Sequence, residues 1–156
     1  MGTEIERKFL VTAGNWRDDA ISRTNMRQGF LSTEPARTVR VRLTDGAAEL
    51  TIKGITVDAQ RAEYEYSIPP TDAAEMLDGL CQPGLIEKTR YRVPHAGHIW
   101  EVDEFQGANT GLIVAEIELE HADEAFALPG WIGEEVTGNP RYYNASLVNQ
   151  PYSGWE

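Results

Sequence analysis

The sequence repeatedly places charged side chains two residues apart, and this spacing constrains the fold more than any other feature. The first group is Glu4, Glu6 and Lys8, near the start of the chain. Five later segments repeat the spacing: Arg40/Arg42, Glu63/Glu65, Lys88/Arg90/Arg92, Glu101/Asp103 and Glu116/Glu118/Glu120. A sixth segment places Lys53 two residues after the polar Thr51. Most of the intervening residues are apolar or aromatic. Because successive side chains of a strand point to opposite faces, each segment predicts a β-strand with one charged face and one apolar face.

The chain is short enough to be one domain, which we place at residues 1–156. It contains no apolar run of the ~18 residues that a membrane span requires, and we see no signal peptide. The single cysteine, Cys81, cannot form an internal disulfide and suits a reducing cytoplasm. The net charge of −11 argues against a nucleic-acid partner, since nucleic-acid binders usually carry a basic face. We therefore expect a cytoplasmic protein with no nucleic-acid or membrane partner.

The order of the predicted elements indicates a barrel. Asn15 can cap a short helix from Trp16, Thr71 can cap a helix through Leu80, and Asn139-Pro140 can start a helix that runs to Val148. The remaining predicted elements are strands, near residues 4–11, 27–33, 38–44, 48–53, 61–68, 85–93, 98–105 and 111–120. About eight strands and few helices predict an α+β, mainly β, fold: an eight-stranded antiparallel closed barrel with a few external helices. The last helix could border one end of the barrel or pack outside it.

The charged faces can be explained in two ways. A sheet with one solvated face produces the same alternation, and for a single strand this is the commoner cause. Here, however, the strands differ largely by sign. The segments at 4–6, 63–65, 101–103 and 116–120 are acidic, and those at 40–42, 53 and 88–92 are basic. Half of the chain's Lys and Arg residues lie on this one face, which favours a shared, charged interior.

Such an interior has a definite chemistry. Buried charges must be paired or must bind ions, because an isolated buried charge is very costly. Arginine and lysine bind phosphate oxygens through charge-assisted hydrogen bonds. Carboxylates hold Mg²⁺ or Mn²⁺, and these cations also bridge phosphates. A barrel with both groups therefore suits a phosphate chain and the cation that neutralises it.

The ordered set of motifs resembles the CYTH superfamily of triphosphate tunnel metalloenzymes. Glu4-x-Glu6-x-Lys8 is similar to the ExExK signature of that family. The later motifs follow in the family's order: Arg40-x-Arg42, Thr51-x-Lys53, Glu63-x-Glu65, Lys88-x-Arg90, Asp103, Glu116-x-Glu118 and Gly138-Asn139-Pro140-Arg141-Tyr142-Tyr143-Asn144. The resemblance covers essentially the whole chain and is closest to the bacterial inorganic triphosphatases.

The resemblance implies an eight-stranded tunnel for a small-molecule triphosphate, an Mg²⁺ or Mn²⁺ cofactor, and a possible homodimer. It implies metal ligands among Glu4, Glu6, Asp103, Glu116 and Glu118. The groups that hold the triphosphate would be Lys8, Arg40, Arg42, Lys53, Lys88 and Arg90. Lys8, Glu63 and Glu65 would be the catalytic group, with the two glutamates serving a second metal or positioning basic residues. A register slip of one residue would put Glu104 in place of Asp103, and Glu101 is a second substitute.

One position departs from the family pattern. Many members have a tyrosine, within a Gln-Gly-Tyr-Leu stretch, as the partner of the signature lysine, but this chain reads Gln28-Gly29-Phe30-Leu31. Phe30 has no hydroxyl, so it cannot orient Lys8 or a water molecule by hydrogen bonding. This departure favours water activated by a metal over a lysine–tyrosine base.

The sequence leaves several functions open. The leading hypothesis is hydrolysis of inorganic tripolyphosphate to pyrophosphate and phosphate. The alternatives are a class IV-type adenylate cyclase, an organic triphosphatase acting on thiamine or nucleoside triphosphates, and a non-catalytic module that binds polyphosphate.

Overall fold

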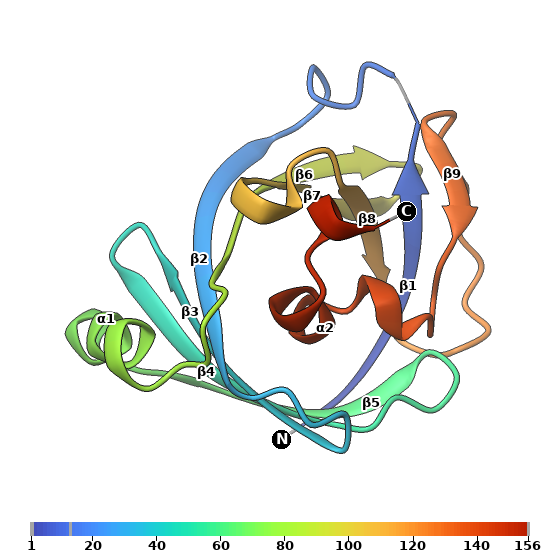
Figure 1. The fold of residues 1–156 in the computed structure, drawn as a ribbon. Helices are drawn as coiled ribbons and strands as arrows, with labels where there is room; N and C mark the ends of the chain where they lie inside the picture. Colours follow the sequence, from blue (N-terminus) through green and yellow to red (C-terminus); the bar gives the residue numbers. More distant parts are fainter. Residues whose placement is uncertain (1, 13, 156) are drawn as a thin grey trace.

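In the computed structural model, which describes residues 2–12 and 14–155, the chain folds into a closed β-barrel (Figure 1). The barrel strands are β1 (Gly2–Val11), β2 (Ser22–Ser32), β3 (Arg37–Thr44), β4 (Ala47–Gly54), β5 (Gln60–Ser67), β6 (Ile86–His95), β7 (His98–Phe105) and β8 (Ile113–Glu118). They are ordered β5-β4-β3-β2-β6-β7-β8-β1, and the pairing of β5 with β1 closes the ring. Every neighbouring pair is antiparallel. The predicted eight-stranded antiparallel barrel is therefore confirmed.

One short strand, β9 (Ile132–Glu135), was not predicted from the sequence. β9 pairs with β1 outside the ring and is only four residues long. It contains Gly133 and shows no alternation of apolar and charged residues, so it lacks the period-2 signal that identified the others.

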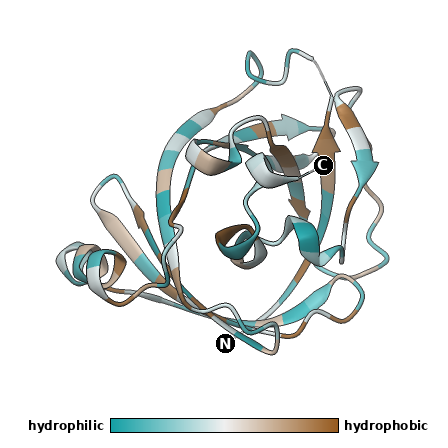
Figure 2. Cartoon of the chain, viewed as in Figure 1, coloured by the Kyte–Doolittle hydropathy of each residue, from teal (hydrophilic) through white to brown (hydrophobic). Residues whose placement is uncertain are grey.

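The barrel has its charged faces inside and its apolar faces outside, so other segments must cover the outer surface. Helix α1 (Pro70–Gly79) packs Ala73 and Leu77 against Val41 and Ala48 of β3 and β4. The residues before β2 and around β9 cover β1 and β6–β8, with close aromatic contacts between Trp16 and Tyr91 and between Trp100 and Trp131. Figure 2 shows hydrophilic and hydrophobic bands alternating along β2.

Two predictions about helix starts were wrong. The segment after β1 forms a turn at residues 16–19 instead of a helix, and Trp16 is buried on the outside of the barrel. Thr71 does not cap α1, which instead begins after Pro69 with Pro70 in the first turn and has no side-chain cap. Proline replaces the cap there because it has no N–H to satisfy and its φ already fits a helix.

The predicted C-terminal helix is broken in two. The 3₁₀ helix η2 (Pro140–Tyr142) begins at Asn139, whose side chain accepts a hydrogen bond from the Arg141 backbone N–H as predicted. Tyr143 is extended, and α2 (Asn144–Asn149) follows it. Further short 3₁₀ helices are η1 (Gly107–Asn109) and η3 (Tyr152–Gly154).

Helix α2 lies across the ring of strands, not outside it (Figure 1). At this end the inward positions of the strands are apolar, and Phe30, Ile86, Phe105 and Val114 pack against Leu147 and its neighbours in α2. The helix therefore closes one end of the barrel with an apolar contact, and the polar part of the interior lies beyond it. Among the described residues, no helix is long and apolar enough to cross a membrane.

Candidate active site

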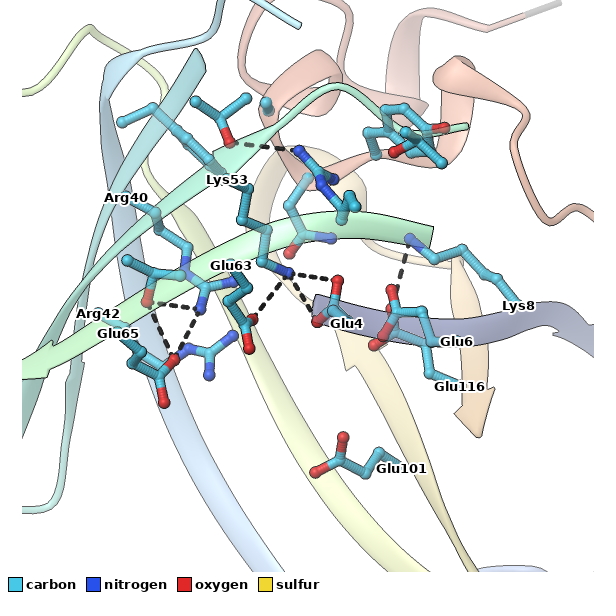
Figure 3. A pocket seen from close by; sticks show the side chains of 18 of the residues that line it. Glu4, Glu6, Lys8, Arg40, Arg42, Lys53, Glu63, Glu65, Glu101 and Glu116 are labelled. Atoms are coloured by element: carbon cyan, nitrogen blue, oxygen red, sulfur yellow. Dashed lines mark hydrogen bonds and ion pairs between the residues drawn. The ribbon is translucent and has the colours of Figure 1, made fainter. Parts of the chain in front are cut away.

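The barrel encloses a cavity of about 620 Å³ whose walls are dominated by charged side chains (Figure 3). Among the described residues, its lining includes eight cationic and eight acidic side chains: Lys8, Arg40, Arg42, Lys53, Arg61, Lys88, Arg90 and Arg92, and Glu4, Glu6, Glu49, Glu63, Glu65, Glu101, Glu116 and Glu118. The chain as a whole carries −11, so the cavity concentrates cations that are scarce elsewhere. Every site residue predicted from the sequence lines this cavity except Asp103.

The strand register explains why opposite charges meet across the wall. Lys8 of β1 is opposite Glu116 of β8, and Lys53 of β4 is opposite Glu63 of β5. Arg90 of β6 is opposite Asp103 of β7. Directly opposed residues of antiparallel strands bring their side chains close together, so the barrel pairs cation with carboxylate around much of its circumference.

Glu116 is at the centre of one of these groups. Its carboxylate lies 3.4 Å from Lys8 Nζ and 3.2 Å from an Arg90 guanidinium nitrogen. Burial opposes ionisation of Glu116, but Lys8, Arg90 and Lys88 outweigh it and hold its pKa well below the usual range. Burial also disfavours the charged form of Lys8, yet Glu116 and Glu6 raise the pKa of Lys8 above its ordinary value. Both groups are therefore ionised at neutral pH.

In the neighbouring carboxylates, nearby lysines do not outweigh burial and repulsion. Burial raises the pKa of Glu6 well above its usual value, and the charges of Glu116 and Glu4 add to the effect. Burial and Glu4 also raise the pKa values of Glu63 and Glu118. Each of these groups gives up its proton less readily because it is buried and other carboxylates are near, so a cation bound here would stabilise the ionised carboxylates.

On the basic side of the cavity, burial and repulsion between cations lower the pKa values. Burial, with repulsion from Arg40 and Arg90, lowers the pKa of Arg42 to about 9. Burial lowers the pKa of Lys88 to about 7, with Asp103 opposing the shift and Arg90 adding to it. Burial and Arg90 likewise lower the pKa of Arg40, whose buried Nε has no hydrogen-bond partner among the described residues. A bound anion would offset the repulsion among these arginines and could accept a hydrogen bond from Arg40 Nε.

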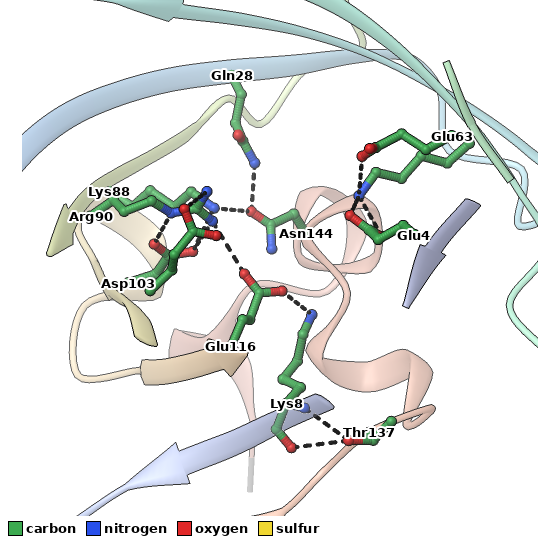
Figure 4. Close-up of polar contacts among 12 residues, drawn as sticks. Glu4, Lys8, Gln28, Glu63, Lys88, Arg90, Asp103, Glu116, Thr137 and Asn144 are labelled. Atoms are coloured by element: carbon green, nitrogen blue, oxygen red, sulfur yellow. Dashed lines mark hydrogen bonds and ion pairs between the residues drawn. The ribbon is translucent and has the colours of Figure 1, made fainter. Parts of the chain in front are cut away.

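Asp103 lies behind the cavity wall. Its carboxylate accepts hydrogen bonds from Arg90 Nε at 2.8 Å and from a second Arg90 nitrogen at 2.9 Å, and Lys88 Nζ lies at 2.8 Å (Figure 4). The alternative residue Glu104 forms an ion pair with Arg17, which is not part of the cavity lining, whereas Glu101 does line the cavity. The strand register therefore points the Asp103 side chain inward as expected, but both of its carboxylate oxygens bind Lys88 and Arg90.

Lys8 has an aromatic neighbour that the sequence did not indicate. Phe30 is buried and lines the cavity. Lys8 Nζ lies 5.5 Å from the centre of the Tyr143 ring, and the Arg61 guanidinium lies 5.8 Å from the same centre. Tyr143 comes from the extended residue between η2 and α2, so the C-terminal segment brings a phenol to this part of the cavity.

Sequence reasoning missed several polar residues of the site. Gln28, fully buried on β2, accepts a hydrogen bond from Arg42 Nε at 3.1 Å and donates one to Asn144. The inward spacing of Gln28 and Phe30 on one strand could have revealed Gln28, because a polar side chain at an inward position requires a partner. Asn144 belongs to the family motif at residues 138–144, but the motif gave it no role, since its approach to the cavity depends on how α2 crosses the barrel.

The donor set fits a hard divalent cation chemically, because carboxylate oxygens are the preferred ligands of Mg²⁺ and Mn²⁺. In the described part of the chain, no three carboxylate, histidine or cysteine side chains are already drawn together around one point. Glu4 instead binds Lys53, whose Nζ lies 3.0 Å from both of its carboxylate oxygens. A cation at these glutamates would therefore replace an internal ion pair.

Comparison with known proteins gives a consistent match. The family model of the CYTH domain matches residues 2–152. The chain is 45% identical over 156 residues to an inorganic triphosphatase of Acetivibrio thermocellus, covering 100% of this chain and 99% of that protein. It is 39% identical over 152 residues to an inorganic triphosphatase of Nitrosomonas europaea, covering 94% and 97% of the two chains.

Solved structures share the fold. The inorganic triphosphatase NE1496 superposes with a TM-score of 0.68 at 36% identity, covering 95% of each chain. A putative adenylyl cyclase from Hippeastrum superposes with a TM-score of 0.60 at 15% identity, covering 76% of this chain and 80% of that one. The second likeness, at that identity, concerns the fold alone.

Proposed function

Because this chain belongs to the CYTH domain family, we propose that it is a metal-dependent triphosphatase that hydrolyses inorganic tripolyphosphate to pyrophosphate and phosphate. The observation that carries the proposal is that the cavity contains one group of carboxylates and one group of cations, each with uncompensated repulsion between like charges. Carboxylates at Glu4, Glu6 and Glu118 repel one another, and cations at Arg40 and Arg42 do the same. A phosphate chain would neutralise the cations, and the metal ion bound to it would neutralise the carboxylates. The names of the 45% and 39% identical relatives support the same activity.

The substrate would be held by the basic side chains. We assign Arg40, Arg42, Lys53, Lys88 and Arg90 to the phosphate oxygens, since each lines the cavity and phosphate prefers such donors. Glu65 accepts a hydrogen bond from Thr51 at 3.0 Å and lies 3.7 Å from Arg40, and Glu63 lies 3.4 Å from Lys53. We therefore assign Glu63 and Glu65 to positioning these two cations.

The metal would be Mg²⁺ or Mn²⁺, held by Glu4, Glu6, Glu116 and Glu118. When bound, it supplies neutralisation of charge on the phosphate oxygens. Asp103 belongs to the same predicted ligand set, and in the present arrangement it orients Arg90 and Lys88.

In the reaction, a water molecule attacks the terminal phosphorus and the anhydride P–O bond breaks. Pyrophosphate leaves with the electron pair of that bond, and the proton lost by water passes to phosphate or solvent. Phosphoryl transfer of this kind depends mainly on positioning and on charge stabilisation. Lys8, ion-paired with Glu116, contributes a positive charge next to the reacting group.

The proposal is tested by measuring phosphate release from tripolyphosphate, pyrophosphate, ATP and thiamine triphosphate, and cyclic AMP formation from ATP. Each assay is run with Mg²⁺, with Mn²⁺ and with EDTA. We expect phosphate from tripolyphosphate with a metal and none with EDTA. Tight binding of tripolyphosphate without turnover under either metal would overturn the enzyme assignment, and cyclic AMP as the main product would replace it.

A further inference from the structure

Resting on the proposed function, we propose that Asn144, the first residue of α2, is a positioning residue that sets two cations of the triphosphate site. It does so through a chain of hydrogen bonds to Lys88 directly and to Arg42 by way of Gln28. The C-terminal segment would then form part of the substrate site as well as closing one end of the barrel.

The contacts form one continuous path (Figure 4). Lys88 Nζ lies 2.9 Å from Asn144 Oδ1, and the Gln28 side-chain amide donates to the same oxygen. The other end of Gln28, Oε1, accepts from Arg42 Nε at 3.1 Å. The path therefore joins α2 to β6, β2 and β3.

The direction of each bond is dictated by chemistry. Lysine and arginine can only donate hydrogen bonds. Lys88 therefore requires the oxygen of Asn144, and Arg42 requires the oxygen of Gln28. Gln28 is left with its NH₂ group toward Asn144, which is the arrangement observed. No other orientation of the two amides satisfies both cations, so the amides select one geometry for Lys88 and Arg42.

Burial makes the path consequential. Gln28 is 0% exposed and Lys88 is 2% exposed, so water cannot easily replace a lost partner. Asn144 supplies this buried ammonium with an oxygen acceptor in addition to Asp103. Without Asn144, Lys88 would keep only Asp103 as a hydrogen-bond partner among the residues that the structure describes. The side chain of Gln28 would lose the contact that fixes its orientation, and its hydrogen bond with Arg42 would weaken.

The test is a pair of double-mutant cycles, read as the dissociation constant of tripolyphosphate in EDTA by calorimetry, so that no turnover occurs. The variants are N144A, K88M, R42M and the doubles N144A/K88M and N144A/R42M. We expect N144A to weaken binding by roughly 10-fold, the size of one hydrogen bond to a charged group. The matched control is N149A at the exposed last residue of the same helix, which should bind as the wild type does.

If Asn144 acts through Lys88 or Arg42, its effect shrinks once that cation is gone, so at least one cycle is non-additive. Additive effects in both cycles would overturn the proposal and assign Asn144 a direct contact with substrate or a purely structural role. If N144A does not fold, Q28M takes its place in the cycle with R42M, since methionine is close in shape to glutamine and removes the link between Asn144 and Arg42. A wild-type protein that neither binds nor cleaves tripolyphosphate would instead refute the proposed function.

Discussion

The ammonium of Lys53 lies 3.0 Å from both carboxylate oxygens of Glu4 and thereby links the basic and acidic sides of the cavity (Figure 3). The two residues have different proposed partners, since Lys53 is assigned to phosphate and Glu4 to the metal. In the free protein each residue is therefore bound to the other and not to its proposed ligand. Binding of substrate and cation would exchange one internal ion pair for two external ones.

The first prediction concerns this competition. The variant K53M removes the cation that occupies Glu4, so Mn²⁺ should bind more tightly than to the wild type, by about 10-fold if the pair contributes like other partly buried charged contacts. The KM for tripolyphosphate should rise, because a phosphate contact is lost. Electron paramagnetic resonance titration with Mn²⁺ measures the first effect. R37M, at an exposed position outside the cavity lining, is the control. Weaker Mn²⁺ binding by K53M would contradict the assignment of Glu4.

The second prediction separates Glu118, the last residue of β8, from Glu120, which lies two residues beyond the end of the strand. E118Q should lower kcat by about 100-fold, because it removes a proposed metal ligand from the site where charge is neutralised. Glu120, two residues further on, is exposed and does not line the cavity, so E120Q should keep wild-type activity. Steady-state kinetics with saturating Mg²⁺ gives both values. Equal kcat for the two variants would refute the role of Glu118.

The third prediction concerns Phe30. In the structure Lys8 forms an ion pair with Glu116 and faces the ring of Tyr143, and Phe30 packs in the apolar contact with α2. We therefore expect F30Y to leave kcat and its pH dependence within about twofold of the wild type, well under the 100-fold or more that a new general base contributes. A large gain, with a new ionisation in the pH profile, would show that a lysine–tyrosine base had been missing.

The fourth prediction is a dependence of stability on pH at the outer strand. The hydrogen bonds from Arg7 lower the pKa of Glu135, and burial opposes the shift. A carboxyl whose folded pKa lies below its unfolded value stabilises the fold above the unfolded pKa, and this contribution disappears as pH falls through the folded pKa. Because the pair is about one-third exposed, E135Q should cost only about 0.5 kcal/mol at pH 7.

Urea denaturation at pH 7 and at pH 3 measures this difference. The gap between wild type and E135Q should be present at pH 7 and smaller at pH 3. E134Q, at the exposed neighbouring position, controls for the change in net charge. A gap that is unchanged at pH 3 would mean that Glu135 acts through packing and not through its charge.

The alternation of side chains along strands explains how much of the site could be predicted. Two-residue spacing puts Glu4, Glu6 and Lys8 on one face in any strand, whatever surrounds it. The same rule placed Arg40, Arg42 and their counterparts inward, and the barrel confirms that face for all of them. The same rule places Phe30, Ile86, Phe105 and Val114 inward. Their apolar side chains indicate that one end of the barrel is closed by an apolar contact, which was not predicted from the sequence.

What the sequence by itself determined was the inward face of each strand, and with it the charged interior, because strand periodicity is local. Only the tertiary structure decided which inward groups reach the cavity and which hold others in place. Asp103 has the spacing of a ligand, but the packing of Lys88 and Arg90 over it leaves it behind the wall. Asn144 reaches Lys88 across 56 residues of chain because α2 crosses the barrel. Contacts of this kind depend on how distant segments pack, which no short spacing encodes.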